Sequence, residues 1–218
     1  MKSIAILHTT PATISSLNPL IKQADGDVAI FNFLDDSILP EINRAGEITP
    51  GVRARFYALA QAAAMTKPGA ILCACSSVGG LLEECRGFLP VLAYRIDEPM
   101  AELAVSKSDA ITVAATLQST LNPTMDLLSR TAAKLGKSPN LEPLLINGAA
   151  PLLAQGRMEE YEQLVATRLA QAAGNCSCIV LAQASMAGAA AKIPDADLGS
   201  CIILSSPKSG IEAVLKKL

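Results

Sequence analysis

Residues 70–80, Ala-Ile-Leu-Cys-Ala-Cys-Ser-Ser-Val-Gly-Gly, join a short apolar run to a turn of small residues. Residues 70–74 are continuously apolar, which is typical of a strand covered on both faces in a parallel sheet. The paired glycines Gly79 and Gly80 predict a tight turn before a helical stretch. Cys75 is therefore expected at the carboxyl end of a buried strand, where open parallel sheets bind their ligands.

Further apolar runs of this kind alternate along the chain with stretches of helical pattern. The predicted strands are residues 3–7, 27–33, 70–74, 91–94, 110–114, 141–145, 178–182 and 201–204. The predicted helices are residues 51–66, 119–135, 158–173 and 207–215. Such alternation predicts an α/β fold of parallel sheets with right-handed crossovers.

Two fragments of the chain recur in the same order. Residues 4–9 (IAILHT) resemble residues 111–116 (ITVAAT) at an offset of 107, and residues 72–77 (LCACSS) resemble residues 181–186 (LAQASM) at an offset of 109. The repeats predict two pseudo-symmetric lobes, residues 1–97 with 206–218 and residues 98–205. Each lobe is expected to hold a short, mostly parallel sheet flanked by helices, with the active site in the cleft between the lobes.

Composition excludes several classes of partner. The formal net charge is -2 and only 3% of residues are aromatic, so the protein is not expected to bind nucleic acid, which requires a basic surface for phosphates or aromatic side chains for base stacking. The first apolar run is too short for a signal sequence or a membrane span, which favours a cytoplasmic protein that binds no membrane. In a reducing cytosol the six cysteines are expected to be free thiols.

Metal and nucleotide sites are not indicated. The pairs Cys73/Cys75 and Cys176/Cys178 fall at opposite ends of their predicted strands, so a shared zinc ion is disfavoured. The single histidine, His8, rules out a histidine-rich metal site. No glycine-rich nucleotide motif is present, so no cofactor is expected.

Polar side chains gather at four predicted strand ends. They are His8, Thr9, Cys75, Ser76, Ser77, Thr116, Thr120 and Ser185. A thiol before a helix ionises more readily and can serve as a base or nucleophile. The neighbouring hydroxyl and backbone N–H groups are suited to bind a carboxylate.

Structural roles for the same residues remain open alternatives. Cys75 is equally explained as a small residue in a tight turn, with Ser77 capping the helix, and His8 as a structural hydrogen-bonding group. Asp97 or Glu98 is expected to orient His8, cap the next helix or bind a substrate ammonium group. The acids Asp35 and Asp36 are expected to begin a turn before Pro40.

The order of these strand-end motifs resembles the aspartate/glutamate racemase superfamily over nearly the whole chain. That family places one cysteine at the matching strand end of each lobe, and the two thiols exchange a proton with a carbon next to a carboxylate, without cofactor or metal. Its Cys-Asn-Thr motif resembles Cys75-Ser76-Ser77, and its Thr-containing loop resembles residues 116–120. The resemblance implies a catalytic role for Cys75. His8 is also expected to be catalytic, because it ends the first predicted strand and imidazole suits proton transfer at neutral pH.

The second family motif, Gly-Cys-Thr-His, falls on Gln183-Ala184-Ser185-Met186, so Ala184 replaces the second cysteine. An acidic pair of glutamate racemases falls near Ala154 and Gln155, where the charge is missing. One-sided chemistry is therefore expected: isomerisation, decarboxylation or carbon–carbon cleavage through an enolate, with Thr9, Ser76, Ser77, Thr116, Thr120 and Ser185 binding the substrate.

The resemblance thus implies a racemase-like isomerase acting on a small carboxylate-containing substrate. A decarboxylase or carbon–carbon lyase is the alternative reaction, and a catalytically lapsed carboxylate sensor is the alternative class. Covalent hydrolysis through Cys75 remains a third interpretation. By analogy with such folds, the chain is expected to form a homo-oligomer, commonly a dimer.

Overall fold

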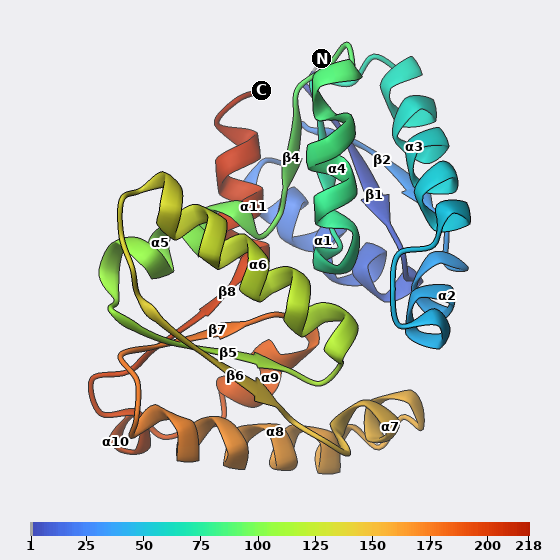
Figure 1. Ribbon diagram of the computed structural model, residues 1–218. Coiled ribbons are helices and arrows are strands. Elements are labelled where there is room, and N and C mark those ends of the chain that lie inside the picture. Colours follow the sequence, from blue (N-terminus) through green and yellow to red (C-terminus); the bar gives the residue numbers. More distant parts are fainter. Residues whose placement is uncertain (1) are drawn as a thin grey trace. The chain divides into compact units, whose positions relative to one another are not determined.

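The computed structural model describes residues 2–218, which form two four-stranded parallel sheets with helices on both faces (Figure 1). The chain separates into two compact units, Met1–Glu98 with Pro207–Leu218, and Pro99–Ser206. The α/β architecture with parallel sheets, predicted from strand–helix alternation, is confirmed.

Unit 1 contains the first half of the chain and the last helix. Its strands are β1 (Ser3–His8), β2 (Ala29–Leu34), β3 (Ala70–Cys73) and β4 (Ala93–Arg95). Its helices are α1 (Pro11–Ala24), α2 (Ile38–Ala45), α3 (Pro50–Met65), α4 (Gly79–Cys85) and α11 (Ser206–Leu215), with 3-10 turns at Ser76–Val78 and Arg86–Phe88.

The sheet of unit 1 has the order β2-β1-β3-β4 and is buried on both faces. Alternate side chains of its strands enter two separate cores, as the pleat requires. Ala5 and Leu7 pack with α2, α3 and α4, whereas Ile4 and Ile6 pack with α1 and α11. This two-sided burial explains why the central strands are continuously apolar.

Unit 2 repeats the same plan. Its strands are β5 (Ala110–Ala115), β6 (Asn140–Leu145), β7 (Cys178–Leu181) and β8 (Ile202–Ser205). Its helices are α5 (Glu98–Lys107), α6 (Gln118–Lys134), α7 (Ala149–Ala154), α8 (Met158–Ala173), α9 (Ala187–Ala190) and α10 (Asp195–Leu198), with a 3-10 turn at Ala184–Met186.

The two sheets share one topology. The order β6-β5-β7-β8 of unit 2 matches the order β2-β1-β3-β4 of unit 1, with β5, β6, β7 and β8 corresponding to β1, β2, β3 and β4. In unit 1 Leu7 pairs with Cys73, and in unit 2 Ala114 pairs with Leu181. The 3-10 turns Ser76–Val78 and Ala184–Met186 then match at an offset of 108. The second repeat was therefore aligned one residue too far in the sequence.

The predicted strands are all present in the described part of the chain, with ends shifted by at most two residues. The four predicted helices are also present; Thr49 caps α3 by accepting a hydrogen bond from Val52 N at 3.1 Å. Helix α1 was not predicted, since Pro19 lies in its interior and should disfavour it by about 3 kcal/mol. Burial of Leu17 and Ile21 against the sheet outweighs this cost.

A buried guanidinium ties β4 to the helix that follows Cys75. Arg95 is 2% exposed and donates from Nε and Nη2 to the two carboxylate oxygens of Asp97, each at 2.8 Å. Its Nη1 donates to Glu83 Oε1 on α4 at 2.6 Å. Burial alone would lower the pKa of Arg95. The hydrogen bonds and negative charges of Asp97 and Glu83 have the larger effect and raise that pKa.

Replacing Gly79 tests this packing, because a Cβ there would overlap the Arg95 guanidinium. We expect Gly79→Ala to lower the free energy of unfolding by about 3 kcal/mol, from overpacking and disruption of a buried ion pair. Gly80→Ala is the matched control, since a Cβ at Gly80 meets nothing within 4 Å. Urea unfolding of both variants gives the comparison, and equal stabilities would contradict this account.

Candidate functional site

Cys75 and Thr9 follow neighbouring strands at the carboxyl edge of the unit 1 sheet. Strands β1 and β3 are neighbours in parallel register, with Leu7 opposite Cys73 and Ala74 N donating to Leu7 O at 3.0 Å. Thr9 and Cys75 each follow two residues beyond the paired positions. The strand ends that lead to His8–Thr9 and to Cys75 are therefore neighbours in the sheet.

The thiol of Cys75 is neither sealed in the core nor fully exposed. Cys75 is half-buried, packs beside the α2–α4 core and has extended backbone angles of φ -128° and ψ 116°. It precedes the 3-10 turn Ser76–Val78, and α4 begins only at Gly79. The sequence suggested that the Cys75 thiol precedes a helix directly. In the structure a 3-10 turn separates the thiol from the first turn of the α-helix.

Cys73 differs sharply from Cys75, although the two thiols are close in sequence. Cys73 is 1% exposed, and its Sγ donates to the carbonyl oxygen of Cys75 at 3.5 Å. Burial, followed by the neighbouring Cys75, raises the pKa of Cys73 well above its usual range. Cys73 therefore remains a neutral core thiol that braces the backbone of Cys75.

Thr9 carries a buried hydroxyl with no hydrogen-bond partner among residues 2–218. The residue is 3% exposed, and its Oγ1 is unpaired. It lines a hollow of about 180 Å³ at the ends of β1 and β2. The other lining residues are Thr10, Pro11, Asp36, Leu39, Pro40 and Asn43. An unpaired buried hydroxyl costs about 1–3 kcal/mol, which is the energy that a ligand oxygen could recover.

Ser76 and Ser77 lie in the turn after Cys75 and are both buried. The backbone N–H of Gly79 donates to the carbonyl of Ser76, which fixes this turn. The carboxyl ends of β1 and β3 are thus followed by one thiol, Cys75, and three hydroxyl residues, Thr9, Ser76 and Ser77.

His8 is completely buried and hydrogen-bonded at both ring nitrogens. Nδ1 lies 2.7 Å from Thr13 Oγ1, and Nε2 lies 2.9 Å from Asn32 Oδ1. Burial lowers the pKa of His8, partly opposed by the hydrogen bond with Asn32. The ring is therefore held neutral between α1 and β2, and its catalytic role stays a prediction.

The corresponding edge of unit 2 is built differently. Thr116, which follows β5 as Thr9 follows β1, donates to Gln183 Oε1 from its backbone N at 2.6 Å and from its Oγ1 at 3.0 Å. Gln183 is the residue before the turn Ala184–Met186, as Cys75 is before Ser76–Val78. The structure therefore aligns Gln183, and not Ala184, with Cys75.

The other predicted residues of unit 2 are also ordered by neighbours. Ser185 is exposed, and its Oγ lies 3.0 Å from the hydroxyl of Tyr161, which is fully buried. Burial raises the pKa of Tyr161, partly offset by this hydrogen bond. Thr120 is buried in the first turn of α6, where its carbonyl oxygen accepts from Thr124 Oγ1.

The acidic residues singled out from the sequence make hydrogen bonds and ion pairs within the protein. Asp97 pairs with Arg95, a partner that the sequence analysis did not consider. Glu98 lies in the first turn of α5 and accepts from Arg95 N at 3.2 Å and from Arg86 Nη2 at 2.7 Å. The turn predicted at Asp35 is present, since its Oδ1 accepts from Ser37 N at 3.0 Å.

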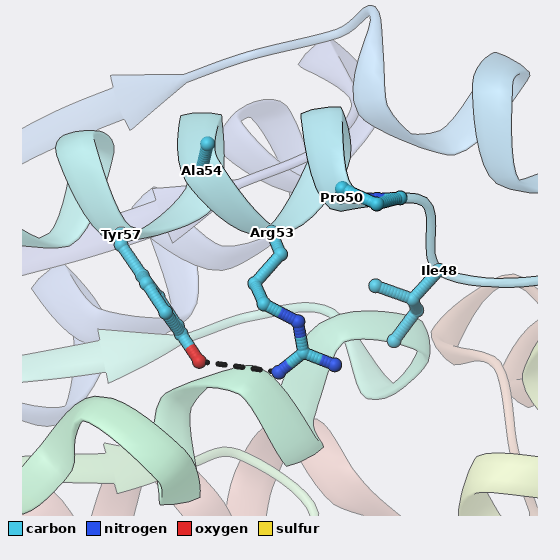
Figure 2. Close-up of a pocket in the computed structure, with 5 residues that line it drawn as sticks. All are labelled: Ile48, Pro50, Arg53, Ala54 and Tyr57. Carbon is cyan, nitrogen blue, oxygen red and sulfur yellow. Dashed lines mark hydrogen bonds between the residues drawn. The ribbon is translucent and has the colours of Figure 1, made fainter.

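A larger hollow, of about 390 Å³, lies on the surface of the first half of α3 (Figure 2). Its lining residues are Ile48, Pro50, Arg53, Ala54 and Tyr57, and none of them was a predicted site residue. Arg53 and Tyr57 both bond to the Glu84 carboxylate. The guanidinium is thereby paired within unit 1.

Cysteines outside the strand edges form no metal centre in the described residues. In unit 2, Cys176 Sγ lies 3.6 Å from Cys201 Sγ.

No helix in residues 2–218 is long and apolar enough to cross a bilayer.

The sequence did not single out Gln183, which the structure shows as the hydrogen-bond partner of the candidate Thr116. The signal was the repeat itself: an offset of 108 in place of 109 aligns Gln183 with Cys75. Short apolar repeats tolerate a one-residue shift, so the alignment was decided only by strand pairing.

Solved structures of similar fold were found with low sequence identity. Aspartate racemase from Picrophilus torridus has a TM-score of 0.71 at 12% identity, covering 99% of this chain and 94% of that one. Glutamate racemase from Aquifex pyrophilus has 0.67 at 18%, covering 99% and 84%. Allantoin racemase from Klebsiella pneumoniae has 0.67 at 14%, covering 99% and 87%.

No protein-family model matches the sequence, and no curated protein matches it. Two parallel four-stranded sheets of one shared topology define the class of fold. The chain has the fold of the aspartate, glutamate and allantoin racemases, which confirms the resemblance at the level of structure.

The state of His8 predicts a pH dependence of stability. Because its folded pKa lies below the unfolded value of about 6.5, the unfolded chain binds the proton more readily. The free energy of unfolding should be constant near pH 8 and fall as pH drops below about 6.5. His8→Gln should reduce this slope, as measured by urea unfolding across the range; an unchanged slope would contradict a neutral buried ring.

The contrast between Thr9 and Thr116 predicts opposite effects of one substitution. Thr9→Val removes an unpaired buried hydroxyl and should leave stability unchanged or raise it by up to about 1 kcal/mol. Thr116→Val removes a donor from Gln183 and should cost about 1 kcal/mol. Denaturation midpoints of the two variants provide the test, and equal losses would show that Thr9 is bonded in solution.

Proposed function

We propose that the protein is a cofactor-independent enzyme of the aspartate/glutamate racemase type, acting at the carbon α to a carboxylate of a small acid. Cys75 is the acid/base group of this proposal. The reaction is racemisation, isomerisation, or decarboxylation and carbon–carbon cleavage.

The unpaired Thr9 hydroxyl, at the strand end that neighbours the one before Cys75, is the observation that carries the proposal. It combines with a half-buried thiol at the carboxyl edge of a parallel sheet. Native proteins leave few buried hydroxyls unsatisfied, and those at strand ends are suited to a ligand oxygen. The fold shared with aspartate and allantoin racemases supports an enzyme of racemase type.

The proposed proton transfer uses residues of unit 1. The Cys75 thiolate takes the α-proton, the electron pair of the broken C–H bond moves onto the substrate carboxylate, and an enediolate forms. Donors from Thr9, Ser76 and Ser77 stabilise the developing oxyanion. The thiol exchanges its proton with water and then protonates the carbon, which completes exchange with solvent. In decarboxylation, loss of CO₂ generates the same enolate, and the thiol then supplies the proton.

One-sided chemistry is the form of the proposal that the residues support best. Gln183 occupies the position equivalent to Cys75, and an amide does not transfer protons at neutral pH. The same observation favours a second candidate function, a carboxylate sensor without turnover. Ligand binding with neither solvent exchange nor product formation would identify the sensor.

Exchange in heavy water tests the enzyme. Aspartate, glutamate, allantoin and phenylmalonate are each incubated with the protein, and proton NMR follows loss of the α-proton or product formation. Turnover of a substrate should fall by at least about 100-fold in Cys75→Ser, the usual contribution of a general acid/base. Cys176→Ser is the control, because Cys176 is also half-buried but lies in unit 2.

Two results would overturn parts of this proposal. Equal turnover by wild type and Cys75→Ser would remove Cys75 from the chemistry. Deuterium incorporation into both enantiomers of one substrate would contradict the one-sided mechanism, since it requires proton delivery to both faces.

A further inference from the structure

The unit 2 sheet brings two thiols into contact at the amino ends of β7 and β8. Cys176 precedes β7 and Cys201 precedes β8, and these two parallel strands are neighbours in the sheet. Ile202 N donates to Ser177 O at 3.1 Å, so the backbone next to each cysteine is fixed by strand pairing. The two Sγ atoms lie 3.6 Å apart, although the residues are distant along the chain.

Cys176 and Cys201 share one core of unit 2, and the third cysteine of this unit lies in the other. Cys201 is a buried member of the core that packs on α8, and Cys176 packs against the same core. Cys178 is fully buried in the core on the α5 and α6 face of the sheet. The structure therefore pairs Cys176 with Cys201, although Cys178 is closer to Cys176 in the sequence.

The two thiols differ in access, which sets the order in which they react. Cys176 is half-buried, whereas Cys201 is only 6% exposed. Burial, followed by the hydrogen bond with Cys176, raises the pKa of Cys201 to about 12, so Cys201 alone is a poor nucleophile. A small oxidant therefore meets Cys176 first. Cys201 is then already in contact with the modified sulfur, and this proximity offsets its low reactivity.

We propose that Cys176 and Cys201 are a redox modification site, at which a reversible disulfide forms within unit 2. The oxidant class is a small-molecule disulfide, such as glutathione disulfide. In a reducing compartment both residues stay thiols, as all six cysteines are in the structure. The crosslink forms as the ratio of small disulfide to small thiol rises. The proposal is independent of any chemistry at Cys75.

The reaction is two successive thiol–disulfide exchanges. The Cys176 thiolate attacks one sulfur of the small disulfide, whose S–S bond breaks, and the first small thiolate leaves and takes up a proton. The Cys201 thiolate then attacks Cys176 Sγ, which forms the protein disulfide and releases the second small thiolate, also to be protonated. The two protein thiols lose two electrons and two protons, and the small disulfide becomes two thiols.

The crosslink requires little movement and should stabilise unit 2. A disulfide holds its sulfur atoms about 2.05 Å apart, so atoms now 3.6 Å apart must approach by about 1.5 Å. The bond closes a loop over residues 177–200, which includes the turn Ala184–Met186, α9 and α10. Closing a loop restricts the unfolded chain, so the crosslinked protein should melt at a higher temperature than the reduced protein.

Peptide mapping of the oxidised protein tests the site. The reduced full-length chain is incubated under native conditions at increasing ratios of glutathione disulfide to glutathione, alkylated, and digested with trypsin without reduction. Cys201 falls in the tryptic peptide 193–208, and Cys176 falls in the peptide 169–192 together with Cys178. Mass spectrometry should show the two peptides joined in most molecules at the highest ratio.

Cys178→Ala is the matched control, because it leaves Cys176 as the only thiol of peptide 169–192. This variant should crosslink like wild type, whereas Cys176→Ala and Cys201→Ala should not. Oxidation should raise the melting temperature of wild type and of Cys178→Ala by at least about 5 °C. It should leave that of Cys176→Ala unchanged. Circular dichroism of each reduced variant shows that it is folded.

Several results would overturn the proposal. One is a mixed disulfide of Cys176 with glutathione that does not proceed to the crosslink. Others are joined peptides that appear only in urea, or that appear equally in Cys176→Ala. A melting temperature lowered by the crosslink would show that the bond distorts unit 2, and would equally contradict the proposed site. None of these measurements uses turnover, so their outcome is separate from that of the proposed enzyme.

Discussion

The pairing of Arg95 with Asp97 and Glu83 fixes the carboxyl edge of the unit 1 sheet around the turn after Cys75. A charged guanidinium is buried there only because two carboxylates satisfy it, and removing one partner of such a pair is strongly destabilising. The guanidinium packs against Gly79, where a side chain would not fit. The turn that carries Ser76 and Ser77 therefore lies between the Cys75 strand end and a fixed ionic contact.

The two strand edges share one topology and have opposite states of hydrogen bonding. In unit 1 the Thr9 hydroxyl is unpaired, and Cys75 follows the neighbouring strand. In unit 2 the equivalent Thr116 is bonded to the oxygen of Gln183, so a side chain of the protein takes the place that a ligand oxygen could occupy. A duplicated fold can in this way keep its architecture while only one edge retains a thiol.

The positions of the strands were predictable because burial on both faces leaves a direct mark on composition. The end of β3 just before Cys75 and the helix α3, with Thr49 and Pro50 at its start, followed from local patterns. Helix α1 did not, because its stability depends on Leu17 and Ile21 packing on the sheet despite Pro19. The partner of Asp97 was also missed, since a buried Arg95 is not visible in sequence.

The sequence by itself determined the α/β class, the duplicated plan and the location of Cys75 at a strand end, because apolar runs and turn residues are local properties of the chain. Only the tertiary structure decided that Thr9 is unpaired, that His8 is enclosed by Thr13 and Asn32, and that Gln183 is equivalent to Cys75. These facts depend on strand register and side-chain hydrogen bonds between residues distant along the chain, and a shift of one residue in register changes them all.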